Sequence, residues 1–448
     1  MQEILNLLRV ASESRQAELS EADQEKIQRI YQWQLATLEH AKNTSVEDFQ
    51  PAVKSLYNYL TCTAQSDSTA RRFATSMITE IPKQYRAFNS LTDWFKCIDY
   101  VIQRAPVFGE ETFPMSKLFV FYMFSPSGNS LFMLQEFNSL LTQVLRTWCT
   151  FLDSSDSKSV LNPSQAIPAT EGWLSPAAQE ELCLEQSLNY QNHNNPEMPY
   201  WGFSSYNDFF HRQLDLEQYR PLPEDDSDKV VVSANDGTVY RISRDVKRCD
   251  EFWNKGQPYS LLDMLGGTSN NPTPTPEELI EPFIGGDVMQ SFLSGADYHR
   301  WHAPISGKVI RAQVIEGMTF SELRSEGLDL SAGTDSQVYQ AMVNTRGLVI
   351  IESDQGHGLV AIIPIGITEI SSISLSITEG QRVEKGQELG YFSYGGSTLA
   401  LVFQKDMVAS FTAQEASENA EFPACKCTNN CSVDQGCLRV RGEIARLK

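Results

Sequence analysis

Residues 347–366 read GLVIIESDQGHGLVAIIPIG. Two runs rich in β-branched residues flank the polar stretch 354–358, a pattern typical of two strands joined by a hairpin turn. The same short β-branched runs, separated by glycines, recur at residues 230–240, 307–317 and 373–403. The second half of the chain is therefore predicted to be β-rich.

Residues 379–390 add glycines where tight turns need a positive φ. This passage resembles the β-sandwich of biotinyl and lipoyl carriers. Those carriers present a modifiable lysine, typically within Met-Lys-Met, and that tripeptide does not occur in this chain. The resemblance to carriers therefore concerns the fold alone.

The first half has helical periodicity. Ser20 and Asp23 resemble a capping box, and apolar residues then recur at steps of three and four, which places them on one helix face. This stripe consists of Ile27, Ile30, Tyr31, Leu35 and Leu38, and similar patterns cover residues 52–60, 69–78 and 130–152. Residues 154–199 are polar and turn-rich, as in a connecting region, and the polar insert 266–278 is expected to be an exposed loop. We predict an α+β protein with a helical domain at 1–195 and a β-rich domain at 196–448.

The charge and hydropathy of the chain exclude several classes of protein. The 448 residues contain 36 basic and 57 acidic side chains, a net charge of −21 that would repel nucleic-acid phosphates and anionic lipids. The longest apolar run, residues 118–124, is far shorter than the roughly 18 residues of a membrane span. The N-terminal residues lack the pattern of a secretory or mitochondrial signal. We expect a soluble cytosolic protein without nucleic-acid partners or an integral membrane segment.

The nine cysteines are an odd number, and Cys62, Cys97, Cys149, Cys183 and Cys249 are widely scattered, which favours reduced, mostly buried thiols. The tail 425–437 holds four more cysteines. Their spacing matches no standard zinc pair, so loosely ordered thiols or adventitious disulfides are favoured over a metal site.

Three short motifs contain side chains suited to catalysis. His299 and His302 lie three residues apart, Asp236 precedes a glycine after a predicted strand, and Gly396 and Ser397 precede an apolar strand. Taken singly, each motif is typical of an ordinary turn or structural position. A metal site would require further ligands beside the two histidines, so no metal is predicted.

In their order along the chain, the three motifs resemble those of the pyruvoyl-dependent phosphatidylserine decarboxylase family. The match runs from about Tyr206 to Phe403 and includes the stretch YNDFF at 206–210. Four stretches of the first half, at 104–109, 147–148, 151–154 and 172–174, resemble the fungal L-tryptophan decarboxylases of psilocybin biosynthesis, a soluble branch of that family. Gly395 also follows this branch, since the membrane enzymes have leucine there.

The resemblance implies a self-processing enzyme. The Ser397 hydroxyl would attack the carbonyl of Gly396 and turn that amide into an ester, and β-elimination would then break the chain between residues 396 and 397. The dehydroalanine left at position 397 would hydrolyse with loss of ammonia to a pyruvoyl group at the new N-terminus. By family match His302 is the base for this step, oriented by Asp236, and His299 returns a proton to the substrate carbon. The pyruvoyl ketone condenses with the substrate amine and accepts electrons as CO2 leaves, so no external cofactor is implied. The two fragments are expected to stay associated.

A free aromatic L-amino acid is the expected small-molecule substrate, with L-tryptophan first and L-tyrosine or L-phenylalanine next. One alternative is a phosphatidylserine decarboxylase that makes phosphatidylethanolamine. Another is a non-catalytic binding protein on the same fold, and a third is a hydrolase that uses Ser397 with His302 and leaves the chain intact.

Overall fold

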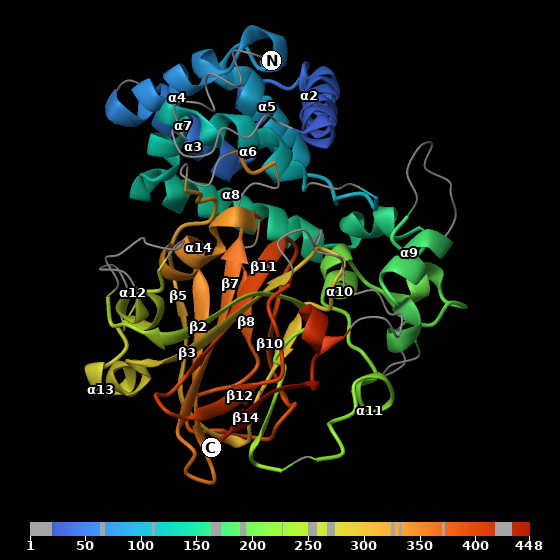
Figure 1. Cartoon of the computed structure of the whole chain (residues 1–448). Coiled ribbons are helices and arrows are strands. Elements are labelled where there is room, and N and C mark those ends of the chain that lie inside the picture. The colour runs from blue at the N-terminus through green and yellow to red at the C-terminus, as the bar shows by residue number, and fades with distance from the viewer. Residues whose placement is uncertain are drawn as a thin grey trace. The chain divides into compact units, whose positions relative to one another are not determined.

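The computed structural model describes residues 20–62, 68–109, 113–162, 172–188, 194–225, 227–249, 258–266, 274–323, 328–330, 334–369, 372–416 and 432–448. They form two compact units (Figure 1). The helical unit comprises the described parts of Met1–Pro106, Glu110–Phe151 and Met318–Gln337. The sheet unit comprises those of Val107–Gly109, Leu152–Gly317 and Val338–Lys448.

The first helix of the helical unit begins where the sequence predicts. In α2 (Glu21–Ala41) the backbone N–H of Asp23 donates to Ser20 Oγ at 3.0 Å, and the Ser20 N–H donates to the Asp23 carboxylate at 3.2 Å. This reciprocal pair satisfies two backbone donors that the first helical turn leaves free. Ile27 and Ile30 are buried as expected. The capping-box prediction is confirmed.

Among the other helices of this unit, α3, α4 and α8 agree with the predicted stretches 52–60, 69–78 and 130–152, whereas α5 and α6 were not predicted. The helix α6 is buried along its whole length, which explains why its sequence is apolar on every side. The elements are η1 (Val46–Asp48), α3 (Pro51–Thr61), α4 (Ser68–Glu80), η2 (Lys83–Tyr85), α5 (Leu91–Val101), α6 (Pro114–Phe124), α7 (Pro126–Phe132), α8 (Gln135–Asp153) and η9 (Thr334–Ser336).

The segment after α8 packs within the sheet unit. The Tyr206 N–H donates to Ser157 Oγ at 2.8 Å, and the Trp173 ring lies edge-on to Tyr206 at 5.5 Å. The two compact units divide this part of the chain between Phe151 and Leu152. The described elements of this segment and its continuation are η3 (Ser155–Leu161), α9 (Pro176–Glu181), η4 (Leu184–Ser187), η6 (Pro199–Gly202), α10 (Tyr206–Phe210) and α11 (Leu216–Tyr219).

The centre of the sheet unit is an eight-stranded antiparallel sheet with the order β13-β2-β3-β11-β7-β6-β5-β9. The strands β6 and β7 are joined across residues 354–358, where Gly356 has a φ of 73°, so the predicted hairpin is confirmed. The strands are β2 (Gly237–Val246), β3 (Gly286–Leu293), β5 (Gly307–Ile315), β6 (Arg346–Ser353), β7 (Leu359–Ile367), β9 (Arg382–Val383), β11 (Gly396–Phe403) and β13 (Cys437–Leu438).

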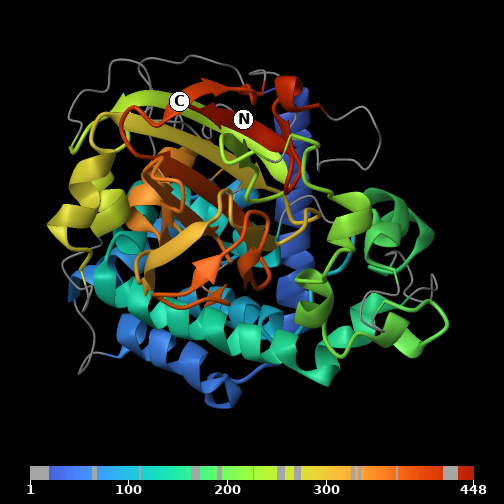
Figure 2. The same ribbon diagram turned by 90° about the horizontal axis from the view of Figure 1, so that it is seen from below.

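Both faces of the large sheet are buried, which explains the continuous apolar runs of its central strands. Successive residues of one strand, such as Leu399 and Ala400, belong to different hydrophobic clusters, one on each face of the sheet. The cluster on the Ala400 face includes residues of α12 (Leu261–Gly266), α13 (Glu277–Ile280), η7 (Glu281–Phe283) and α14 (Gln337–Val343). In both ribbon views, α12 and α13 lie on the opposite side of the strands from α9 and α11 (Figures 1 and 2).

Two three-stranded sheets contribute residues to the cluster on the Leu399 face. This packing of sheet against sheet agrees with the predicted sandwich, and the α+β class is confirmed. The order of the first sheet is β1 (Val230–Val232), β14 (Glu443–Leu447), β12 (Val408–Phe411), and that of the second is β4 (Arg300–His302), β10 (Glu388–Phe392), β8 (Ile373–Leu375); η10 (Val433–Gln435) precedes β13.

The cysteines differ in part from the expectation. Cys183 is disulfide-bonded rather than reduced, as is Cys437 of the tail. Of the free cysteines among the described residues, Cys97 is buried, whereas Cys62 and Cys249 are exposed. Spacing along the chain could not reveal this, because pairing and burial depend on which segments the fold brings together. Residues 425–431 of the tail and 267–273 of the polar insert lie outside the described residues.

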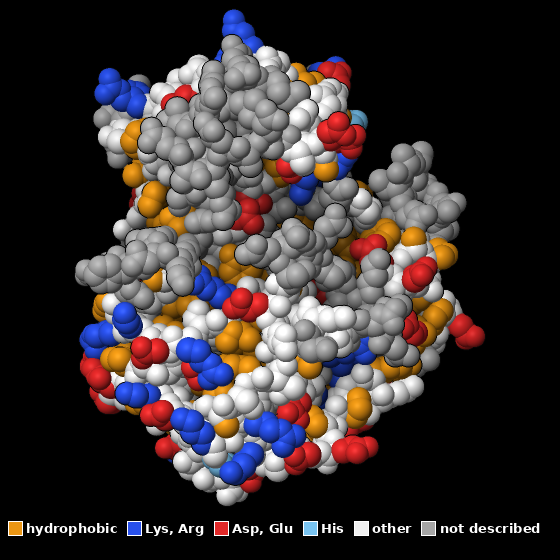
Figure 3. Space-filling view, viewed as in Figure 1, with side chains coloured by type: hydrophobic (Ala, Val, Ile, Leu, Met, Phe, Trp, Pro, Cys, Tyr) orange, Lys and Arg blue, Asp and Glu red, His pale blue; other side chains and the backbone are white. Residues whose placement is uncertain are grey.

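No described helix has both the length and the hydropathy needed to span a bilayer. On the face of the sheet unit seen in Figure 3, acidic and basic side chains are interspersed. Within the described ranges, no group of three or more His, Cys, Asp or Glu side chains could hold a metal ion.

Candidate active site

Ser397 occupies the second position of β11, in the middle of the large sheet. It lies opposite Leu293 of β3 and Gly366 of β7, and its side chain is fully buried. Its Oγ forms no hydrogen bond with any described residue. A buried hydroxyl usually has a partner, so an unpaired one in a central strand indicates a functional position. Gly395, just before the strand, has a φ of 142°, a conformation that a side chain would strain.

The neighbouring Thr398 is held firmly by comparison. Its hydroxyl donates to the carbonyl oxygen of Ser291 at 2.8 Å and accepts from the Gln290 amide at 3.1 Å. The Gln290 amide oxygen in turn accepts from the Tyr259 hydroxyl at 2.7 Å. Of the two adjacent hydroxyls, only that of Ser397 is therefore free to react.

His302, the last residue of β4, has both ring nitrogens in use. Nδ1 lies 3.0 Å from the carbonyl oxygen of Gly386, and Nε2 lies 3.1 Å from the Tyr298 hydroxyl. Because a carbonyl can only accept, Nδ1 carries the proton and Nε2 accepts from Tyr298. Burial lowers the pKa of His302 to about 4, so the ring is neutral near pH 7. Nε2 is therefore the basic nitrogen.

Asp236 does not contact His302 in the way the sequence analysis expected. Its two carboxylate oxygens accept from Arg220 at 2.7 and 3.3 Å, and one of them also accepts from the Val440 N–H at 2.7 Å. In this structure the Gly386 carbonyl, and not Asp236, accepts from His302 Nδ1, and the role of Asp236 in processing stays a prediction. Asp236 pairs with Arg220 because that arginine is itself buried and needs a counter-charge.

His299 lies just before β4 and stacks on Phe210 of α10, with ring centroids 3.9 Å apart. Neither ring nitrogen has a hydrogen-bond partner among the described residues, although the residue is fully buried. Burial, together with the positive charge of Arg212, lowers the pKa of His299 to about 3. Its ring is therefore neutral and free to bond a ligand.

The chain that leads to Ser397 passes beside His299. The Phe392 N–H donates to the carbonyl oxygen of His299 at 3.0 Å. The Tyr394 ring lies edge-on to Phe210 at 5.4 Å, on the ring that also stacks with His299. Gly396, four residues after Phe392 and one before Ser397, begins β11 opposite Ile367. The fold thus brings the histidine motif and the Gly-Ser motif into one region of the sheet unit.

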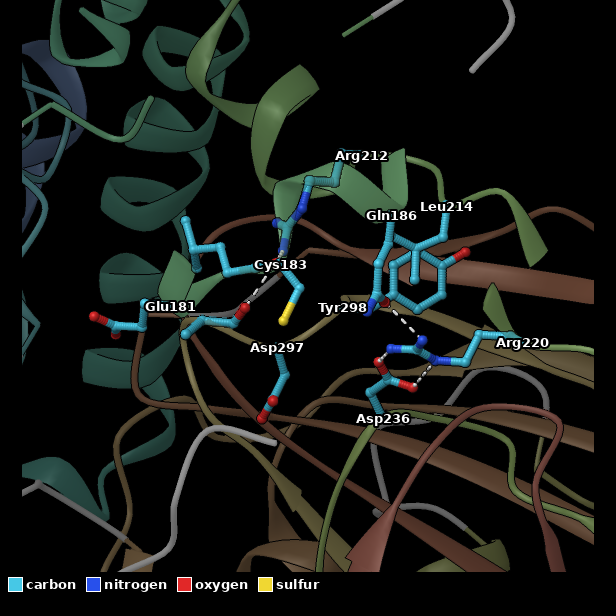
Figure 4. Close-up of a pocket in the computed structure, with 11 residues that line it drawn as sticks. Glu181, Cys183, Gln186, Arg212, Leu214, Arg220, Asp236, Asp297 and Tyr298 are labelled. Atoms are coloured by element: carbon cyan, nitrogen blue, oxygen red, sulfur yellow. Dashed lines mark hydrogen bonds and ion pairs between the residues drawn. The ribbon is translucent and has the colours of Figure 1, made fainter. Parts of the chain in front are cut away.

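A small pocket, partly open to solvent, lies beside this region (Figure 4). Ala296, Asp297 and Tyr298, the three residues before His299, form part of its wall. The Arg220–Asp236 pair and Arg212 line other parts of it, as the side chains in Figure 4 show.

Sequence reasoning missed four residues of this arrangement: Tyr298, Gly386, Arg220 and Arg212. Tyr298 and Arg212 stand beside the motifs at 299–304 and 206–210, so their positions alone could have drawn attention to them. Arg220 and Gly386 carried no such signal, because only the tertiary fold brings them to Asp236 and His302.

Comparisons with known proteins agree with the motifs. A family model for phosphatidylserine decarboxylase matches residues 206–422, and a second model of that description matches residues 50–182. The decarboxylase iboD of Amanita muscaria is 32% identical over 313 residues, which cover 66% of this chain and 85% of that protein. The chain belongs to the phosphatidylserine decarboxylase family.

The relatives of this chain include proteins named tryptophan decarboxylase and proteins named phosphatidylserine decarboxylase. The L-tryptophan decarboxylase of Psilocybe cubensis is 31% identical over 363 residues, 76% of this chain and 78% of that protein. The phosphatidylserine decarboxylase proenzyme of Chlamydia trachomatis serovar L2 is 26% identical over 310 residues, 69% of this chain and 88% of that protein. The chain is accordingly a decarboxylase, which is a carboxy-lyase.

Proposed function

We propose that this chain is a self-processing, pyruvoyl-dependent decarboxylase of a free aromatic L-amino acid. The observation that carries the proposal is the Ser397 hydroxyl, which is fully buried at the start of a central strand and unpaired among the described residues. A structural serine at this position would be expected to have a partner, as Thr398 does.

Self-cleavage requires a carbonyl carbon that is accessible to attack, a hydroxyl that attacks it and a base that accepts the hydroxyl proton. Gly396 has no side chain to hinder attack on its carbonyl by Ser397 Oγ. We propose that His302 accepts the hydroxyl proton, supported by its neutral ring and by the tautomer that Gly386 fixes. Asp236 supports the site indirectly, since it neutralises Arg220 beside it.

A pyruvoyl group formed from Ser397 fits this position. Its place would be the N-terminus of residues 397–448, where the structure has an unpaired oxygen and a glycine before it. When present, the group supplies a ketone that bonds the substrate amine and accepts electrons as the carboxylate leaves. We propose that His299 holds the proton that returns to the substrate carbon.

The two fragments would stay associated after cleavage. Residues 397–448 supply β11, which lies between β3 and β7, and β14, which lies between β1 and β12. Breaking one peptide bond removes none of these strand pairings. We further propose a cytosolic location and an amino-acid substrate, without nucleic-acid partners.

The choice of an amino acid rests on the relatives. Alignments with the two L-tryptophan decarboxylases of Psilocybe cover 76% and 69% of the chain, whereas two of the phosphatidylserine decarboxylase proenzymes cover 49% and 47%. L-Tryptophan is therefore the first candidate, followed by L-tyrosine and L-phenylalanine. Phosphatidylserine remains the alternative, because the Chlamydia proenzyme aligns over 69% of the chain.

The substrate is tested by measuring CO2 release from carboxyl-labelled L-tryptophan, L-tyrosine, L-phenylalanine and micellar phosphatidylserine. We expect turnover of a free aromatic amino acid and loss of turnover in Ser397→Ala. Turnover of the lipid alone would contradict the proposed substrate class and leave the family assignment intact.

A further inference from the structure

Two arginines line the pocket beside His299, and their charges are balanced differently. Arg220 is paired with Asp236 at 2.7 Å and also donates to the Gln186 amide oxygen at 2.6 Å. Arg212 forms no ion pair with any described residue. Its Nη2 donates to the carbonyl oxygens of Leu182 and Ala296, both at the long distance of 3.4 Å, and its Nε has no partner among the described residues.

Arg212 is nevertheless buried, with only 4% of its surface exposed. Burial lowers the pKa of Arg212 to about 10, so its guanidinium is still charged at neutral pH. Its guanidinium carbon lies 5.4 Å from the ring centroid of Phe209, which offsets only part of the lost hydration. A buried cation without an anion is unfavourable, so the site has unused capacity for a negative ligand.

The carboxylates of the pocket do not fill that capacity. Asp236 is held by Arg220, and the Asp297 carboxylate accepts from the Ser294 N–H at 2.6 Å. Asp236 and, after it, Asp297 favour the charged form of Arg212, but neither forms an ion pair with it. The third carboxylate of the pocket belongs to Glu181, an exposed residue. In Figure 4, Arg212 and the Arg220–Asp236 pair lie on different sides of the pocket.

The position of the pocket links it to the proposed chemistry. Its wall includes Ala296, Asp297 and Tyr298, which immediately precede His299. Phe210, two residues before Arg212, stacks on the His299 ring at 3.9 Å. A ligand held by Arg212 would therefore lie close to the residue that we propose as proton donor.

We propose that Arg212 binds the carboxylate of the amino-acid substrate in this pocket. The inference rests on the proposed function and names the group that recognises the substrate. In the planar guanidinium of Arg212, the Nε–H has no partner among the described residues and the two Nη2–H bonds are long. The parallel N–H groups of a guanidinium match the two oxygens of a carboxylate. Because the carboxylate departs during the reaction, Arg212 contributes to substrate binding more than to the barrier, so its loss raises KM more than it lowers kcat.

The test uses the unprocessed Ser397→Ala protein, so that binding is measured without turnover. L-Tryptophan, L-tyrosine and L-phenylalanine are each titrated by calorimetry beside the corresponding amide, which lacks the negative charge. We expect at least one amino acid to bind about 10- to 100-fold more tightly than its amide, the range for a charge-assisted hydrogen-bonded pair. Arg212→Gln in the same background should remove this preference.

Arg382→Gln is the matched control, because that arginine is 67% exposed at the surface of the same unit. It should leave the preference for the carboxylate unchanged. A purely structural Arg212 would lower the thermal midpoint when replaced. We expect Arg212→Gln to keep or raise the midpoint of the ligand-free protein, since the change removes an unpaired buried charge.

Equal binding of every amino acid and its amide would overturn the proposal, as would a preference that survives Arg212→Gln. Selective binding of inorganic phosphate in place of the carboxylates would also overturn it, in favour of a phosphate subsite. If the wild-type chain is never processed but the carboxylate preference depends on Arg212, the proposed function fails and the carboxylate site stands.

Discussion

At the scale of single residues, the site depends on which buried polar groups have partners. Asp236, Arg220, His302 and Thr398 are satisfied by defined hydrogen bonds, whereas Ser397 has an unpaired polar atom. Sequence reasoning identified Ser397 and His302 from their motifs. It could not find the Arg220–Asp236 pair, because the two residues lie 16 positions apart without any periodic relation.

The first prediction concerns Asp236. Asp236→Ala leaves the Arg220 guanidinium buried without its counter-charge, so we expect the free energy of unfolding to fall by about 3–5 kcal/mol. We also expect self-cleavage before Ser397 to become slower in this variant. Urea unfolding in the Ser397→Ala background measures the stability change, and denaturing gels of the otherwise wild-type variant measure processing.

The paired replacement Arg220→Met with Asp236→Leu is its control, since it removes both charges together. We expect it to recover most of the stability and to restore processing, because Gly386 rather than Asp236 fixes the tautomer of His302. Recovered stability without processing would show that Asp236 acts on His302 directly.

At the scale of elements, β11 presents its two hydroxyls to opposite faces of the sheet. The alternation of side chains in a strand puts Thr398 on the face of Ala400, where Tyr259 also lies, and Ser397 on the face of Leu399. The apolar run after residue 397 and its flanking glycines sufficed to predict this strand. Its neighbours β3 and β7 were not predictable, since strand order depends on long-range pairing.

Thr398→Val should destabilise the sheet unit by about 1–3 kcal/mol, because it removes the buried hydrogen bonds of the Thr398 hydroxyl with the Gln290 amide and the Ser291 carbonyl. Thr398→Ser keeps the hydroxyl and should cost less. Urea unfolding of both variants in the Ser397→Ala background tests this. Equal stabilities for valine and serine at this position would refute the role of the Tyr259–Gln290–Thr398 chain of hydrogen bonds.

At the scale of the whole molecule, the buried histidines connect the site to overall stability. The pKa of His299 is lowered to about 3 and that of His302 to about 4, both below the ordinary value of 6.5. Between pH 6.5 and 4 the unfolded chain therefore binds protons that the folded chain does not. Each histidine should reduce the free energy of unfolding by about 1.4 kcal/mol per pH unit as the pH falls through this window.

Urea unfolding of Ser397→Ala at pH 7, 6 and 5 checks this slope. His299→Gln should reduce this slope by about 1.4 kcal/mol per pH unit, because glutamine does not titrate and unfolding then takes up one proton fewer. An unchanged slope in His299→Gln would show that the imidazole is not held neutral by burial.

The division of the molecule also shows what sequence patterns can and cannot reveal. Helical periodicity and the β-branched runs predicted the α+β class, α2, α3, α4 and α8, and the strands between residues 230–240, 307–317, 347–366 and 373–403. They did not predict that the described residues 152–162 and 172–188 pack with the sheet unit, because the contacts between Ser157 and Tyr206 and between Trp173 and Tyr206 are tertiary.

The central claim is that the chain cuts itself before Ser397, and intact mass spectrometry under denaturing conditions tests it most directly. Freshly purified wild type should separate into a fragment that ends at Gly396 and a fragment of residues 397–448 whose N-terminus has the mass of a pyruvoyl group. Ser397→Ala should remain one chain. A wild-type protein that stays whole over a range of pH would contradict the account.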